Sequence, residues 1–269
     1  MRKVIDTNYM KSPELREYLS DPANSAVIPD FAIMETLRGR DPESISQQVQ
    51  ILSEHPNQVL LLKTTHAICG LRPRRRGRGL QRRLIDKKQS AAFKPFCEKV
   101  SKAKDGDAVL RAQLSEKSDN AEADLVQIAQ GQETFVANLA EHAKKYTEAE
   151  LKILRKGEPV TPELLDKITR EILGLAAALF AAHPYFKKLP RYEDLPNSFI
   201  FRYAVVGYVI ALRCIKEGGA AGASPENIRN QMVDAMMVTY STFFDGFLSD
   251  DKRANELYET ARDLLKITH

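Results

Sequence analysis

The chain has 269 residues, of which 43% are hydrophobic, so it is long enough for one sizeable domain or for a core with an elaborate insertion. Its three cysteines are an odd number without C-x-x-C spacing, which disfavours a disulfide framework and a thiolate zinc site and favours a reducing compartment. The first residues are charged, and the longest apolar runs are about half a membrane span, so we expect a cytoplasmic protein without a secretory signal or a membrane partner.

The net charge of +4 hides one concentrated basic segment. Residues 72–88 carry a charge of +8, which leaves −4 on the rest of the chain. Such a segment is typical of a surface that binds a polyanion, because guanidinium groups match phosphate oxygens with paired hydrogen bonds. The arginines expected to contact nucleic acid are Arg72, Arg74, Arg75, Arg76, Arg78, Arg82 and Arg83.

Prolines and glycines in the first half of this basic segment predict an exposed loop. The alternative to nucleic-acid contact is a solubilising loop without a partner. No Phe, Tyr or Trp stands among the arginines, so any stacking on unpaired bases has to come from elsewhere in the chain.

The N-terminal quarter alternates short apolar runs with amphipathic stretches. Ser12-Pro13 and Asp41-Pro42 are typical helix starts, with a capping side chain followed by proline in the first turn. Strands that alternate with helices predict a parallel sheet. The expected strands are 3–5, 26–28 and 59–62, and the expected helices are 13–19, 31–37 and 42–54.

From about residue 91 to 183 the sheet pattern stops and apolar residues recur at helical spacing. Thr161-Pro162 predicts a helix start inside this block, and His183-Pro184 predicts an end. The C-terminal part then predicts a helix over 198–216, a second helix from 225, a strand at 247–248 and a helix over 252–265.

Acidic residues stand at chemically informative places in these elements. Asp6 directly follows the first strand in V-I-D-T-N, and Glu35 lies in the helix after the second strand. Asp234 lies on a late helix, and Ser249-Asp250-Asp251 follows the last strand. In this order the acids resemble those of the PIN-domain (PIN-like) ribonucleases, over about residues 1–65 and 198–269.

The resemblance implies an α/β, PIN-like three-layer fold with a central parallel sheet and a mainly α-helical insertion. It divides the chain into a nuclease domain of residues 1–65 and 198–269, a basic arm of residues 66–90 and a helical insertion of residues 91–197. Compact members of the family lack such an insertion, so this chain departs from their pattern in its middle.

The resemblance also implies which residues perform the chemistry. The catalytic acids and metal ligands would be Asp6, Glu35, Asp234 and Asp251, with Asp250 as the alternative to Asp251. Asn8 and Ser249 are candidates for orienting the carboxylates or a phosphate. Asn230, one helical turn before Asp234, is a third candidate for this orienting role.

Carboxylates that converge at one sheet edge raise one another's pKa, and one or two Mg²⁺ or Mn²⁺ ions relieve the repulsion. We therefore expect a divalent-metal-dependent endonuclease that hydrolyses phosphodiester bonds in RNA. RNA rather than DNA follows from the resemblance alone.

Three other functions stay open: a non-catalytic nucleic-acid-binding or regulatory PIN-like module, a DNA nuclease of the flap-endonuclease type, and a metal-dependent phosphohydrolase of small substrates. Each acid also has a plain structural interpretation. Asp6 can cap the strand end, Glu35 can be a solvated helix residue, and Asp250 or Asp251 can cap the last helix. A homo-oligomer is compatible with the sequence.

Overall fold

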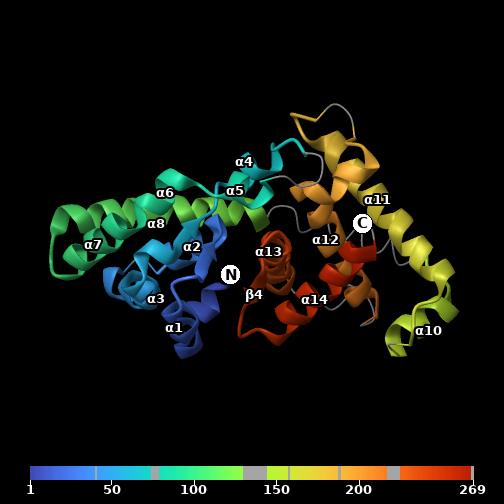
Figure 1. The fold of residues 1–269 in the computed structure, drawn as a ribbon, viewed down its shortest axis with the longest axis horizontal. Coiled ribbons are helices and arrows are strands. Elements are labelled where there is room, and N and C mark those ends of the chain that lie inside the picture. The colour runs from blue at the N-terminus through green and yellow to red at the C-terminus, as the bar shows by residue number, and fades with distance from the viewer. Residues whose placement is uncertain are drawn as a thin grey trace. The chain divides into compact units, whose positions relative to one another are not determined.

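The computed structural model describes residues 1–39, 41–73, 79–129, 144–156, 158–186, 189–216 and 225–267 (Figure 1). Its internal contacts separate the chain into two compact units. Unit 1 comprises Met1–Ile68, Gly79–Ile128 and Tyr240–Asn255, and unit 2 comprises Cys69–Arg78, Ala129–Thr239 and Glu256–His269. The predicted domains, with boundaries at residues 65, 90 and 197, do not coincide with these two units, and the predicted division stays a prediction.

Unit 1 is built on a four-stranded sheet in which every neighbouring pair is parallel, in the order β3-β2-β1-β4. The strands are β1 (Arg2–Ile5), β2 (Ser25–Ile28), β3 (Val59–Leu61) and β4 (Gly246–Leu248). Val4, at the centre, lies opposite Val27 on one side and Phe247 on the other. The expected mixed α/β architecture with a parallel sheet is confirmed.

Helices and 3₁₀ turns connect these strands. In chain order they are η1 (Thr7–Lys11), α1 (Pro13–Ser20), α2 (Asp30–Leu37), α3 (Pro42–Glu54), η2 (Pro56–Gln58), α4 (Thr65–Cys69), α5 (Leu80–Leu84), α6 (Lys87–Ala91), α7 (Phe93–Lys104) and α8 (Ala108–Ala129). The predicted caps are present, since the side chain of Ser12 accepts a bond from the Glu14 amide and that of Asp41 from the Ser44 amide. Local sequence signals therefore set the helix starts.

Helices α7 and α8 pack with α2 and α3 rather than apart from them. Buried side chains from all four helices form one apolar cluster: Leu37, Ile45, Val100, Ala103, Leu114 and Ala121. At its edge Lys104 pairs with Glu43 at 3.1 Å. Part of the predicted helical insertion thus belongs to the same compact unit as the sheet.

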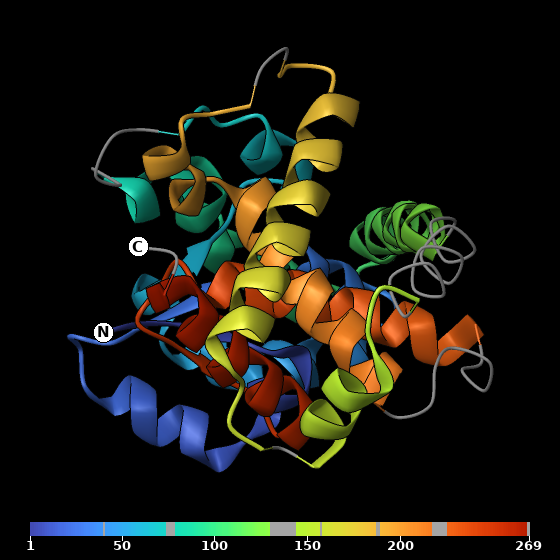
Figure 2. The same cartoon turned by 90° about the vertical axis from the view of Figure 1, so that its right-hand side faces the viewer.

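Unit 2 is helical in the residues that the structure describes. Its helices are α10 (Glu148–Lys156), α11 (Pro162–Ala182), η4 (Tyr192–Asn197), α12 (Phe199–Lys216), most of α13 (Pro225–Ser241) and most of α14 (Lys252–Ile267). Helix α11 packs along α12, as Figure 2 shows. Thr161 caps α11 as predicted. No helix in the described part of the chain is long and apolar enough to cross a membrane.

Candidate functional site at the carboxyl edge of the sheet

The strand order creates a topological switch point between β1 and β4. The chain moves outward from β1 through β2 to β3 and later returns to place β4 on the other side of β1. In open parallel sheets, ligands bind at the carboxyl ends of the strands where the direction of winding changes. Here the loop after β1 meets the loop after β4, and the amide of Asp6 donates to the carbonyl of Leu248 at 2.9 Å.

Asp6 lies at this switch point with its side chain half-buried. Its Oδ1 accepts a 2.8 Å bond from the Thr7 amide, and its Oδ2 accepts a 2.5 Å bond from Ser249 Oγ. Burial raises the pKa of the Asp6 carboxyl above its ordinary value, and the negative charge of Asp251 adds to the rise. The bonds from Ser249 and Thr7 act in the opposite direction but do not cancel it.

Asn8 and Ser249 join the two loops. Ser249 Oγ accepts a 3.0 Å bond from the Asp251 amide and lies 3.4 Å from both polar atoms of the Asn8 amide group. Asn8 Oδ1 also accepts a 3.2 Å bond from the Asp250 amide. Both predicted orienting residues are therefore in contact with each other, and Ser249 also bonds Asp6.

The structure distinguishes Asp251 from Asp250. Asp251 is half-buried, and its Oδ1 accepts bonds from the Arg253 and Ala254 amides at 2.6 and 3.2 Å, so it caps α14. Its charge nevertheless acts on Asp6, whereas the charge of the exposed Asp250 acts on Tyr9, whose pKa is raised chiefly by burial and by Glu14 and only then by Asp250. Asp251 therefore combines the structural role that the sequence left open with electrostatic coupling to Asp6.

Glu35 is connected to the same loop through Thr7. The Thr7 hydroxyl donates to Glu35 Oε2, while the Thr7 carbonyl accepts a 2.7 Å bond from Gln48 on α3. Glu35 is half-buried on α2, with its carboxylate directed to the residue after Asp6. Glu35 was among the predicted site residues, but Thr7, which bonds it to the loop after β1, was not.

A second half-buried carboxylate, Asp30, lies at the same edge and was not among the predicted site residues. Its Oδ2 accepts a 2.7 Å bond from the Thr65 amide, and its Oδ1 accepts bonds from the Phe31 amide at 3.0 Å and the Tyr240 hydroxyl at 3.4 Å. Burial raises the pKa of Asp30, against the effect of these donors. The available signal was its place after β2, which parallels that of Asp6 after β1.

Other predicted residues lie outside this cluster or outside the described chain. Asp234 is half-buried and Asn230 exposed on the part of α13 that belongs to unit 2, so their meeting with the acids of unit 1 stays a prediction. Arg72 and Arg82 are exposed, and Arg83 is half-buried on α5. The other predicted contacts, Arg74, Arg75, Arg76 and Arg78, lie outside the described residues.

The site offers oxygen ligands, but in the described residues they do not form a preformed metal-binding group. Across the ranges that the structure describes, no three Asp, Glu, His or Cys side chains are grouped so that they could hold a metal ion. The nearby donors are carboxylate, hydroxyl and amide oxygens from Asp6, Glu35, Ser249 and Asn8. Such hard donors suit Mg²⁺ and Mn²⁺ better than softer metals.

Comparison with known proteins adds no identification. No protein-family model matches the chain, and searches against curated proteins and solved structures gave no match. The PIN-like resemblance therefore rests on the residues described above.

Proposed function

We propose that the carboxyl edge between β1 and β4 hydrolyses phosphodiester bonds with the help of a divalent cation. The observation that carries the proposal is Asp6, a half-buried carboxylate at the topological switch point whose pKa is raised by burial and by Asp251. Burial removes water from a carboxylate and destabilises its charged form, and a bound cation would stabilise that charge.

The donor set fits a magnesium-like ion. Mg²⁺ keeps several waters and commonly uses one or two protein carboxylates together with substrate phosphates, so a cage of three acids is not required. Asp6 and Glu35 would hold the ion, and Asp234 is the third proposed ligand. When bound, the ion would lower the pKa of a water molecule and stabilise charge on the phosphate.

The chain's own residues then have separate tasks. Ser249 holds Oδ2 of Asp6, and Thr7 holds the carboxylate of Glu35, so both acids are oriented before substrate arrives. Asn8 fixes the β4 loop through the Asp250 amide. The negative charge of Asp251 lies near Asp6, so the two carboxylates repel each other, and a bound cation would relieve this repulsion.

We propose RNA as the substrate, with DNA of the flap-endonuclease kind as the alternative. The support is the basic segment of residues 72–88, of which Arg72 and Arg82 are exposed. Phosphate contacts of this kind act through counterion release, so binding should weaken steeply with salt.

The test compares Asp6→Asn with a matched control, Asp263→Asn, which changes an exposed carboxylate on α14. In Mn²⁺, Asp6→Asn should cleave a single-stranded RNA at least about 100-fold more slowly than wild type, as expected when a metal ligand is lost. Asp263→Asn should cleave at the wild-type rate. Wild-type cleavage by Asp6→Asn, or full activity of the wild type in excess EDTA, would refute the proposal.

A second readout is independent of catalysis. Mn²⁺ at 100 times its dissociation constant should stabilise the wild type by about 2.7 kcal/mol and leave Asp6→Asn nearly unchanged. The lack of a three-acid group among the described residues favours one other candidate, a nucleic-acid-binding module without activity. That candidate would bind RNA with salt-dependent affinity, show no Mn²⁺ stabilisation, and leave RNA intact.

A further inference from the structure

Exposed apolar side chains gather in one short stretch of unit 2, between α11 and η4. Seven large hydrophobic side chains are exposed in the described part of the chain, and three of them lie within a stretch of eight residues: Tyr185, Leu189 and Tyr192. Single exposed apolar side chains are ordinary, but a cluster of them marks a surface that binds a partner. The chemistry around these side chains indicates which partner.

The exposed ring of Tyr185 is positioned by a series of ring contacts that begins in the core. Phe180 on α11 is buried, and Phe186 packs edge-on against it with 5.2 Å between ring centroids. The ring of His183 lies 5.1 Å from that of Phe186 and 5.5 Å from that of Tyr185, whose amide donates to His183 Nδ1. Tyr185 is 62% exposed, so it offers a flat apolar face to a ligand.

Basic side chains accompany these rings. Residues 183–192 contain three basic residues and no acidic one. Arg191 is 83% exposed, and its ion pair with Glu193 spans 3.9 Å, which is longer than a hydrogen bond. Arg72, the first arginine of the basic segment, lines the same open hollow of about 580 Å³ as Phe186 and Arg191. Aromatic faces among cations are typical of surfaces that bind single-stranded nucleic acid.

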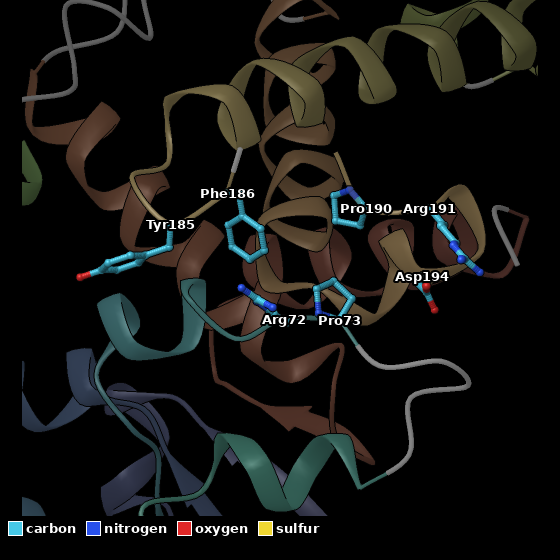
Figure 3. Close-up of a pocket in the computed structure, with 7 residues that line it drawn as sticks. All are labelled: Arg72, Pro73, Tyr185, Phe186, Pro190, Arg191 and Asp194. Carbon is cyan, nitrogen blue, oxygen red and sulfur yellow. The ribbon is translucent and has the colours of Figure 1, made fainter. Parts of the chain in front are cut away.

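The lining residues form a row rather than a ring around one point. In Figure 3, Tyr185 lies at one end of the lining and Arg191 at the other, and the Phe186 ring and the Arg72 guanidinium lie between them in this view. All of these residues belong to unit 2. A ligand with a single phosphate does not suit two separated arginines, whereas a nucleic-acid strand has a phosphate at every nucleotide.

The two ends of the row differ in charge. Asp194 lines the hollow at the end where Arg191 lies, and Glu193 is paired with that arginine. A phosphate at Arg191 is therefore attracted less strongly than it would be without these acids. Asp194 Oδ1 is buried, so it is no contact for a ligand.

We propose that this surface binds unpaired nucleotides of an RNA strand. One base would stack on Tyr185, and separate phosphates would contact Arg72 and Arg191. Stacking on an aromatic ring requires a base whose face is open, so base-paired RNA cannot make this contact. The surface thus supplies the stacking group that the basic segment lacks in its own sequence. The choice of RNA rests on the proposed function.

The experiment is fluorescence anisotropy of the full chain with a labelled oligouridylate of about 12 nucleotides, a length typical of single-strand sites. The same strand paired with oligoadenylate is the duplex probe. Both are titrated in EDTA, so that the result is independent of the proposed metal site. Wild-type cleavage by Asp6→Asn would refute the nuclease and leave this surface standing, whereas failure of the variants below would leave the metal site standing.

Substitutions at Tyr185 test the stacking contact. Tyr185→Leu keeps an apolar side chain without an aromatic face, so it should weaken the single strand at least about fivefold, the loss of one stacked base, and leave the duplex unchanged. Tyr185→Phe keeps the ring and should bind as the wild type does. Unchanged single-strand binding in Tyr185→Leu, or an equal loss for the single strand and the duplex, would overturn the proposal.

Substitutions of charged residues test the phosphate contacts. Arg72→Ala and Arg191→Ala should each flatten the log–log salt dependence by about 0.7, the value for one phosphate of a single strand. Arg170→Ala, at an exposed arginine of α11, is the matched control and should leave the slope unchanged. Glu193→Gln removes an acid beside Arg191 and should strengthen binding. Unchanged slopes in both test variants, or weaker binding by Glu193→Gln, would contradict the phosphate contacts.

An acidic protein is the other polyanion that such a surface could bind, and competition distinguishes it. Polyglutamate has the charge of the strand but no flat bases, so at equal charge it should displace oligouridylate less well than unlabelled oligouridylate does. Equal displacement by polyglutamate would assign the surface to acidic protein segments and overturn the proposal.

Discussion

Asp6 and Asp30 occupy equivalent places in the sheet but are held differently. Each follows a central parallel strand, each is half-buried, and burial raises the pKa of each carboxyl. Asp30 is surrounded by donors, with Thr65 and Tyr240 among them, and burial is the cause that raises its pKa. Asp6 has fewer donors and the negative charge of Asp251 nearby.

The difference indicates two roles for the same residue type. Backbone amides bond both oxygens of Asp30, so this carboxylate connects β2, α2 and the segment after β3. At Asp6 one oxygen is bonded by a backbone amide and the other by the hydroxyl of Ser249, which can rotate and also accept. Asp30 is suited to holding β2, α2 and the segment after β3 together, whereas Asp6 can change its charge or its hydrogen-bond partner with a small loss of folding free energy.

The strongest test of this comparison is the pair Asp30→Asn and Asp6→Asn. At position 30 the new amide NH₂ has to face a backbone N–H, so the free energy of unfolding should fall by about 1–3 kcal/mol. At position 6 the Ser249 hydroxyl can accept from the new amide, and repulsion with Asp251 disappears, so stability should be unchanged or slightly higher.

Urea unfolding at pH 7 in EDTA measures both variants, with Asp263→Asn as the control. A larger loss of stability for Asp6→Asn than for Asp30→Asn would reverse the assignment of roles.

A smaller effect is expected for Tyr240→Phe. The Tyr240 hydroxyl lies 2.5 Å from Thr65 Oγ1 and 3.4 Å from Asp30 Oδ1, and its ring is fully buried. Removing this hydroxyl while keeping the ring should cost about 0.5–1.5 kcal/mol, because Thr65 can still bond Asp30. Combined with Asp30→Asn, the loss should be less than additive; full additivity would show that the two side chains are not coupled.

The pH dependence of stability offers a further distinction. The pKa of Asp6 is raised in the folded state, so the folded chain binds more protons above the ordinary carboxyl pKa of 3.8. Without a divalent ion, the contribution of Asp6 to the free energy of unfolding should therefore decrease as pH rises through its folded pKa.

Asp6→Asn lacks this titration, so its stability relative to wild type should improve from pH 3.5 to pH 7, in urea titrations at a series of pH values. A constant difference across that range would show that the Asp6 pKa is the same in the folded and unfolded chain.

The smallest expected effect separates Asp251 from Asp250. Asn can cap a helix as Asp does, so Asp251→Asn should keep the cap of α14 while removing the charge that acts on Asp6. The pKa of Asp6, followed by NMR of its carboxyl carbon, should fall in Asp251→Asn and stay unchanged in Asp250→Asn. RNA cleavage should also suffer more from the change at 251. If Asp250→Asn has the larger effect on either measurement, Asp250 takes the role.

The sequence predicted the local elements well because their signals are local. The helix starts at Ser12, Asp41 and Thr161 each carry their own capping side chain, and each cap is present. The sequence predicted a strand at 247–248 but not its neighbour, and the structure pairs this strand, β4, with β1 in parallel.

The partners of Asp30 were not predictable in the same way. A carboxylate after a strand has the same sequence signature whether it is bonded by backbone amides or faces another acid. Tyr240 reaches Asp30 across 210 residues, and the periodicity of α13 marks this tyrosine as a core residue only. Long-range contacts of single side chains therefore distinguish the two acids, and no local pattern encodes them.

The pairing of β1 with β4 has a consequence for how the chain folds. The bond between Ser249 and Asp6 joins residues 243 positions apart. During synthesis, one side of β1 therefore has no partner strand until the ribosome has reached β4. Closing so long a loop is slow, and until β4 pairs with it the exposed edge of β1 can pair with a wrong strand. The candidate site is thus completed late in synthesis, and a nascent chain that stops before β4 cannot assemble it.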